Sequence, residues 1–522
     1  MTSTNRKIAR ASIILILITI LGNMLGLFKE ILVAKYFGIT RAIDSFYAAL
    51  SIPTYLLNII LAPFVPIFIP LYIKYRSENT PQDADKLANI FINYILIVFL
   101  IMAACCVLFS RQIIGLSFSG FDPGTIATTA TMLRIVGVTI LFSGMITIFT
   151  GIINAHEKFF WPAASQMLVT LSNIFFLVAF SKKWGGYVFA WGLFFGLLAQ
   201  CLILVYNAVK IGYRHHLDFN WKHPAIVRLF QLASLAMLSS VIAGFTPYFN
   251  RVVASWLPEG SIASLAYADK IFSLPTLIFS GTMVTALFPF ISLQAAEKRI
   301  DELKHTLASS IKMSAFIFIP IAVIIIILAK PLVQLLFQRG AFDTFATDLT
   351  SNVLVFLSFQ LFFIYSIGIL QRVIFAFYGM KSVLVITVIT TILNIVLNVI
   401  FVKVVNPPVV GIALASSIVC AVSALLHFFV VKRELTFLHG ISIIKSILGF
   451  CALAFIAGGG MYLVYNQFGR IIDYSFAFRA VKIGVSASIG FVFYGLLAYL
   501  FKLEEFTKAF SLFKEKVADY LK

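Results

Sequence analysis

Long apolar segments, separated by short polar connections, follow one another along almost the whole chain. Each is about 20 residues long, the length that an α-helix needs to cross the hydrocarbon core of a bilayer. Backbone N–H and C=O groups find no water partner in lipid, so these segments are expected to be helices. The pattern predicts an all-α polytopic membrane protein with about 14 spans. Their centres fall near residues 22, 55, 97, 140, 172, 197, 237, 277, 318, 362, 391, 420, 454 and 489.

The composition supports a membrane protein and argues against an enzyme. Hydrophobic residues make up 61% of the 522 residues and charged residues only 12%, a balance that does not fit a soluble domain. The connections are too short to hold a catalytic domain, and none contains a phosphate-binding glycine loop of the Walker type. We therefore expect a protein that is not an enzyme.

The excess of 40 Lys and Arg residues over 21 Asp and Glu residues has a topological explanation. If the N-terminus lies in the cytoplasm, the basic residues concentrate in the loops on the cytoplasmic side, as the positive-inside rule requires. Clusters at 210–228, 298–312 and 502–522 then determine topology and contact anionic lipid. The distribution predicts that both termini are cytoplasmic and that nucleic acid is not a partner.

The chain repeats itself weakly but in order. Residues 51–54 (Ser-Ile-Pro-Thr) recur as residues 273–276 (Ser-Leu-Pro-Thr), and Asn173 matches Asn394 at nearly the same spacing. Paired repeats with a site between them are the usual build of secondary transporters. We therefore predict two pseudo-symmetric six-helix lobes followed by two additional helices. The predicted parts are an N-terminal lobe at 1–209, a C-terminal lobe at 224–432, two further transmembrane helices at 440–501 and a basic cytoplasmic tail at 502–522.

Prolines occupy matching places in the two repeats, with Pro53 in span two and Pro275 in span eight. Proline removes a helix donor and clashes with the preceding turn, so both spans are expected to be bent or broken. Bent helices at equivalent places in two repeats indicate a substrate pathway. A role in shaping the bundle explains these prolines equally well.

Charged side chains inside a bilayer are costly, and a chain retains them where they face protein, water or a ligand. A cavity that contained Lys29, Arg251 and Lys270 would suit a phosphate or pyrophosphate. Alternatively, these cations form ion pairs with acidic residues, or their side chains extend to the membrane–water interface. Adjacent helix residues point about 100° apart, so Lys29 and Glu30 are not expected to share a direction. The acidic residues considered are Glu30, Asp44 and Asp269.

Asn394 and Asn398 lie four residues apart and are expected on one face of span eleven. With help from Asn250, their oxygens form a weak candidate site for Na⁺. No carboxylate is available there to offset the charge of the ion, so hydrogen bonding by the amides is the favoured alternative.

Five segments carry a specific family pattern, in order along nearly the whole chain. They are residues 26–38 (GLFKEILVAKYFG), 154–159 (NAHEKF), 266–270 (AYADK), 335–342 (LLFQRGAF) and 393–398 (LNIVLN). In combination they resemble the MurJ/MviN family of lipid II flippases.

This resemblance implies a member of the multidrug/oligosaccharidyl-lipid/polysaccharide exporter superfamily, with two six-helix lobes around a cationic cavity. Two extra helices are implied to help form a groove for a polyprenyl tail. The implied substrate is undecaprenyl-pyrophosphate carrying the peptidoglycan precursor. It would move from the cytoplasmic to the outer leaflet of the bacterial cytoplasmic (inner) membrane by alternating access. No cofactor is implied, and the drive would be the membrane potential or coupling to Na⁺ or H⁺.

The sequence also departs from this family. Many relatives have arginines where this chain has Asn23 and Asn58, and some have carboxylates where it has Asn250 and Asn398, so the cavity is expected to be less cationic. The expected substrate-binding residues are Lys29, Arg251, Lys270, Asn23 and Asn58. The expected supporting or gating residues are Glu30, Asp44, Asp269, Pro53, Pro275 and Arg339.

Two alternative functions follow from the same observations. The missing arginines leave room for a flippase that carries another lipid-linked oligosaccharide, such as a capsule, O-antigen or exopolysaccharide precursor. A membrane scaffold that recruits cell-wall synthesis enzymes through the basic loops is a third hypothesis, although the intramembrane charges would then have no purpose.

Overall fold

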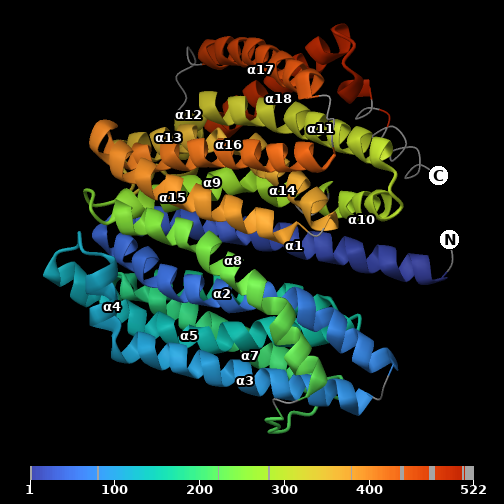
Figure 1. Ribbon diagram of the computed structural model, residues 1–522. Coiled ribbons are helices and arrows are strands. Elements are labelled where there is room, and N and C mark those ends of the chain that lie inside the picture. The colour runs from blue at the N-terminus through green and yellow to red at the C-terminus, as the bar shows by residue number, and fades with distance from the viewer. Residues whose placement is uncertain are drawn as a thin grey trace. The chain divides into compact units, whose positions relative to one another are not determined.

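The computed structural model describes residues 3–78, 81–220, 223–279, 283–377, 379–435, 440–468, 476–507 and 511. These residues form a succession of α-helices, labelled in Figure 1. The helices are α1 (Ser3–Phe37), α2 (Arg41–Glu78), α3 (Pro81–Leu108), α4 (Ser110–Ser117), α5 (Pro123–Ala155), α6 (Phe160–Trp184), α7 (Tyr187–Lys210), α8 (Pro224–Ala254), α9 (Ser261–Phe279), α10 (Met283–Ala296), α11 (Ile300–Ile327), α12 (Ala329–Phe337), α13 (Thr344–Ser358), α14 (Gln360–Ala376), α15 (Met380–Val404), α16 (Pro408–Glu434), α17 (Gly440–Phe468) and α18 (Phe476–Leu500).

The helices form two compact units. The first unit contains Met1–Ala263 and the short segment Arg339–Asp343, and the second contains Ser264–Gln338 and Thr344–Lys522. The helix α8 belongs to the first unit because it packs against α2. The two six-helix lobes predicted from the repeat, at 1–209 and 224–432, stay a prediction. Most of the predicted tail at 502–522 lies outside the described residues.

Close helix packing in the first unit depends on small residues. The helix α5 contacts α2, α3 and α7, and α6 packs against both α1 and α7. On α5, a side chain added at Gly137 would overlap Cys106 of α3, and one added at Gly144 would overlap Phe99 of α3. Glycine is therefore the residue that lets these two backbones approach, as in many membrane bundles.

In the second unit, α11 is the central element. It packs against α14 and α17, while α14 and α15 pack against α16, and α17 packs against α18. Aromatic side chains link α11, α17 and α18, because the ring of Phe316 lies 5.7 Å from that of Phe450 and 5.3 Å from that of Tyr494. Figure 1 shows α11, α17 and α18 as neighbours.

The all-α polytopic fold class is confirmed. Among the described residues, 12 helical segments are long and apolar enough to cross a membrane. Two further predicted spans correspond to α8 and to the α9–α10 pair, so every predicted centre lies within a helix. The helix α2 continues from Arg41 to Glu78 through Pro53 and three other prolines, so span two is not broken, and its bending stays a prediction. Span eight is described as α9 and α10, on either side of residues 280–282, which lie outside the described residues, and Pro275 lies in α9.

Candidate functional site

Lys29 and Glu30, near the end of α1, form an ion pair. The Nζ atom of Lys29 lies 2.8 Å from Oε1 of Glu30, and the hydroxyl of Tyr47 on α2 lies 3.5 Å from Oε2 of the same carboxylate. The prediction that these two neighbours do not share a direction is therefore wrong. Backbone geometry separates the two Cβ atoms, but the flexible lysine stem brings the ammonium back to the carboxylate.

The exposure of this pair is asymmetric. The side chain of Glu30 is 4% exposed and that of Lys29 is 25% exposed. A buried carboxylate is strongly destabilising unless a cation and hydrogen bonds compensate it, and Lys29 supplies the cation. The ammonium of Lys29 therefore has an internal partner, on a lysine side chain that is only partly buried.

The other predicted headgroup residues have different environments. Arg251 is half-buried near the end of α8, whereas Lys270 and Asp269 are exposed on α9. Asn23 and Asn58 are exposed on α1 and α2. Lys29 and Arg251 belong to the first unit and Lys270 to the second, and the convergence of the three cations on one cavity stays a prediction.

Asp44 caps a helix that is distant from it in the sequence. Its carboxylate accepts hydrogen bonds from the backbone N–H groups of Gly260 at 2.7 Å and Ala263 at 2.8 Å. The first N–H groups of α9 lack intrahelical acceptors, and an N-cap carboxylate satisfies such donors. The backbone N–H of Arg41 also donates to Glu259 at 2.6 Å. The segment before α9 is thus fixed to the start of α2.

A second segment meets the same turn. The N–H of Ala341 donates to the carbonyl of Lys35 at 2.9 Å. Gly38 and Gly340 both have positive φ, of 56° and 60°, and any Cβ at either position would overlap the opposing backbone. Arg339, at the beginning of this segment, is half-buried. The turn after α1 is therefore bonded to two segments that come much later in the chain.

The three candidate sodium residues are divided between the two units, and their joint site stays a prediction. Asn394 and Asn398 are fully buried on α15 and share a face, because the amide of Asn398 donates to the side-chain oxygen of Asn394 at 2.9 Å. Asn250 lies in the other unit. Within the described residues, no group of three or more His, Cys, Asp or Glu side chains is arranged to hold a metal ion.

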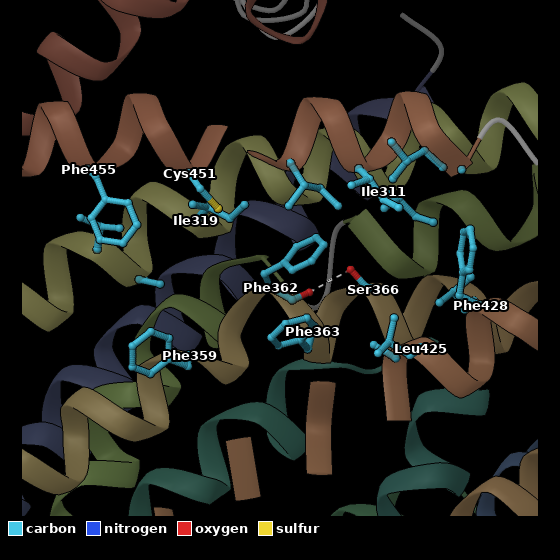
Figure 2. A pocket seen from close by; sticks show the side chains of 18 of the residues that line it. Ile311, Ile319, Phe359, Phe362, Phe363, Ser366, Leu425, Phe428, Cys451 and Phe455 are labelled. Carbon is cyan, nitrogen blue, oxygen red and sulfur yellow. Dashed lines mark hydrogen bonds between the residues drawn. The ribbon is translucent and has the colours of Figure 1, made fainter. Parts of the chain in front are cut away.

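An apolar hollow of about 390 Å³ lies within the second unit, between α11, α14, α16 and α17. Figure 2 shows Phe359, Phe362 and Phe363 on one side of it, with Cys451 and Phe455 of α17 opposite. Ser366 also lines it, but its hydroxyl donates to the carbonyl of Phe362 at 3.0 Å. The hollow therefore offers hydrocarbon contacts and suits an aliphatic chain.

Reasoning from individual residues did not find these lining positions. The family resemblance implied a groove beside the last two helices, but apolar residues in an apolar span carry no signal of their own. The pair formed by Gly38 and Gly340 was also missed as a contact. Its sequence signal is the presence of glycine in two short connections, each of which directly follows a helix.

Comparison with known proteins gives one consistent result. The family model described as "Lipid II flippase MurJ" matches residues 33–481. A probable lipid II flippase MurJ from Buchnera aphidicola is 27% identical over 387 residues, covering 73% of this chain and 76% of that protein. Another from Bdellovibrio bacteriovorus is 24% identical over 520 residues, covering 96% of both.

Solved structures agree on the fold. One described as "Lipid II flippase MurJ, inward closed conformation" superposes with a TM-score of 0.77 at 23% identity, covering 93% of this chain and 99% of that chain. An inward-facing MATE family transporter of the MOP superfamily gives a TM-score of 0.67 at 15% identity, covering 83% of this chain and 99% of that chain. Both are similar in fold.

Proposed function

Because this chain belongs to the MurJ family of lipid II flippases, we propose that it moves undecaprenyl-pyrophosphate-linked peptidoglycan precursor (lipid II) across the membrane by alternating access. The observation that carries this proposal is the match of that family model to most of the chain. The family consists of transporters rather than catalysts, and the multi-pass helical fold agrees with that role.

The apolar hollow supports the proposal because it offers a place for part of the polyprenyl tail. Because the tail comes from lipid rather than from water, the hollow holds it by van der Waals packing. A hollow of about 390 Å³ holds a segment of such a chain rather than the whole of it. In this proposal the rest of the tail stays in the lipid, so the tail can slide while the headgroup crosses.

For the headgroup, we propose contacts from Lys29, Arg251 and Lys270. Pyrophosphate is a strong partner for ammonium and guanidinium groups. The pairing of Lys29 with Glu30 supports a switching role, since an arriving phosphate can compete for an ammonium that is already partly exposed. In the same proposal, the amides of Asn23 and Asn58 donate to sugar or peptide. The proposed gating residues are Asp44, Asp269, Pro53, Pro275 and Arg339.

The orientation and the driving force are also proposals. The distribution of basic residues favours cytoplasmic termini in a bacterial inner membrane, so the substrate would enter from the cytoplasmic leaflet. The membrane potential, or a gradient of Na⁺ or H⁺, would drive the cycle. Asn250, Asn394 and Asn398 remain weak candidates for a Na⁺ site, because three neutral amides compensate a cation poorly.

The test is complementation of a flippase-depleted strain, together with translocation of fluorescent lipid II in vesicles that contain the purified protein. The wild-type chain should rescue growth and move lipid II, and the double variant Lys29→Ala with Lys270→Ala should do neither well. Lys330→Ala is the matched control, because it removes a lysine that pairs with Asp348 at a partly exposed position. Full activity of the double variant would overturn the assignment of the headgroup contacts.

A second candidate is a flippase for another lipid-linked oligosaccharide, and the amides Asn23 and Asn58 favour it because the family resemblance leads us to expect arginines there. Depletion of the protein in its own host distinguishes the two. Accumulation of lipid II supports the first function, and accumulation of a different polyprenyl-linked glycan supports the second. Absence of any translocation, together with capture of cell-wall synthesis enzymes, would instead indicate a scaffold.

A further inference from the structure

A second hollow in the second unit is polar. It has a volume of about 490 Å³ and lies where α11 and α17 begin and the chain leaves α18. We call it the polar pocket, and its charged and hydroxyl lining includes Lys304, His305, Lys312, Ser442, Glu504 and Glu505. The transport cycle proposed above does not use any of these residues.

Glu505 is the most informative residue of the polar pocket. It is only 9% exposed, yet no ion pair or hydrogen bond within the described residues involves its carboxylate. Its neighbours Leu503 and Phe506 pack against the core formed by α11, α17 and α18, and this packing holds Glu505 in place. The carboxylate lines the polar pocket, so a cationic group that enters the pocket can pair with it.

The opposite charge is also available in the polar pocket. The Nζ atom of Lys312 donates to the hydroxyl of Ser442 at 3.0 Å, which leaves further N–H donors and one O–H donor for an anion. Lys304 is 19% exposed and lies 3.4 Å from Asp301, whose side chain is almost fully exposed. An exposed ion pair of this kind is weak, so the ammonium of Lys304 can also bind a ligand.

The polar pocket adjoins the apolar hollow. Ile443 of α17 lines both, and on α11 the hollow is lined by Ile311 and the pocket by Lys312, the next residue. A ligand that fills the pocket can therefore extend an aliphatic chain into hydrocarbon surroundings. This combination of a charged head site and an apolar extension is what a membrane lipid requires.

The charges favour a zwitterionic head over an anionic one. The pocket is lined by three carboxylates (Asp301, Glu504 and Glu505) and two lysines (Lys304 and Lys312). Groups of both signs therefore line the pocket, and a head that carries only phosphate leaves its carboxylates without a partner. A head that carries both a phosphate and an ammonium can satisfy both sides.

We propose that the polar pocket binds an aminophospholipid, with its ammonium at Glu505 and its phosphate at Lys312 and Ser442. A primary ammonium donates hydrogen bonds to a buried carboxylate, whereas a trimethylammonium group of the same charge cannot. The site therefore distinguishes phosphatidylethanolamine from phosphatidylcholine. This inference is independent of the proposed cargo, because it depends only on the lining of the pocket.

The test is native mass spectrometry of the delipidated full-length protein, titrated with phosphatidylethanolamine, phosphatidylcholine or phosphatidylglycerol of identical acyl chains. The wild-type protein should bind phosphatidylethanolamine most tightly. Glu505→Gln should lower the affinity for phosphatidylethanolamine about tenfold, the loss expected for one charge-assisted hydrogen bond. The affinity for phosphatidylcholine should change little. The matched control Lys330→Gln, on α12, should bind like the wild type.

Two results would overturn the proposal. One is equal affinity of the wild-type protein for the three lipids. The other is a Glu505→Gln protein that is less stable in every lipid and in detergent but still prefers phosphatidylethanolamine. Glu505 would then contribute to stability through an internal partner rather than through the lipid. If Glu505→Gln fails to fold, Lys312→Gln and Ser442→Ala at the rim test the phosphate side. Unchanged phosphatidylethanolamine affinity in both would also refute the assignment.

Discussion

The carboxylate of Asp44 accepts a hydrogen bond from the backbone N–H of Gly260 at 2.7 Å, although 215 residues separate the two in the chain. A second bond, from Ala263 at 2.8 Å, completes the cap of α9. A residue at the start of one long helix thus satisfies the orphan donors of another. This contact explains why the segment that precedes α9 belongs to the first unit.

Asp44→Asn should loosen this joint. An amide oxygen accepts less strongly than a carboxylate, and the NH₂ group of asparagine cannot accept at all, so we expect a loss of about 1–3 kcal/mol. Hydrogen exchange at the amides of Gly260 and Ala263 should rise correspondingly. The control is Asp122→Asn, which alters an exposed cap at the start of α5. Unchanged protection of residues 258–265 in the Asp44 variant would contradict this account.

Alanine substitutions of glycine should change the stability of the protein in opposite directions in the neighbouring turn and in α4. Gly38→Ala and Gly340→Ala should each destabilise the protein, by about 1–3 kcal/mol for the positive φ alone and more for the overlap with backbone oxygen. Gly115→Ala is the control, because nothing lies within 4 Å of the added Cβ in α4. It should stabilise by about 0.5–1 kcal/mol. Thermal unfolding in one detergent measures all three, and equal shifts would refute the assigned strain.

The fold could be predicted from the sequence because its signal is local. A run of apolar residues long enough to cross a bilayer must become a helix, whatever it packs against. The face shared by Asn394 and Asn398 was predictable for the same reason, since a spacing of four places them on one side of a helix.

The candidate site was less predictable, because its contacts depend on rotamers and on segments that are distant in the sequence. The bond between Asp44 and Gly260 joins residues that no local pattern connects. The pairing of Lys29 with Glu30 depends on four side-chain torsions of lysine, which the backbone spacing does not determine. The near-burial of Glu505 depends on how the chain folds back after α18, and an acidic residue near the end of a chain otherwise suggests solvent.

The asparagine pair leads to a further prediction. Asn394→Ala and Asn398→Ala should be coupled in a double-mutant cycle by about 0.6–1.7 kcal/mol, the range of hydrogen bonds between side chains in membrane helices. Replacing choline with Na⁺ in the buffer should not raise the unfolding temperature, because neutral amides compensate the charge of the ion poorly. A rise specific to Na⁺ that Asn398→Ala abolishes would instead assign a metal site to this pair.

Filling the apolar hollow should impair tail binding without unfolding the protein. Ala322 is half-buried and lines the hollow, so Ala322→Trp inserts an indole where we propose a polyprenyl segment. Less polyprenyl lipid should copurify with this variant, and lipid II translocation should fall. Ala452→Trp adds the same group to an exposed face of α17 and is the control. Equal lipid content in both variants would show that the hollow does not hold the tail.

The loop after α7 is attached to α3 by its own backbone carbonyls. The amide of Asn93 donates to the backbone carbonyls of His216 at 3.2 Å and Asp218 at 2.9 Å. The hydroxyl of Tyr94 donates to the backbone carbonyl of Phe219 at 2.7 Å. His215 lies in this loop, where burial and the neighbouring His216 lower its pKa below the ordinary 6.5. The folded loop therefore favours the neutral imidazole.

A histidine whose pKa is lower in the folded state than in the unfolded state contributes stability above the unfolded pKa and loses it as the pH falls. Hydrogen-exchange protection of residues 213–219, corrected for the intrinsic pH dependence of exchange, should therefore decrease between about pH 7.5 and pH 5.5. His215→Gln should remove most of this decrease, whereas His305→Gln, on α11 and outside this loop, should retain it. The same decrease in the His215 variant would mean that another group controls the loop.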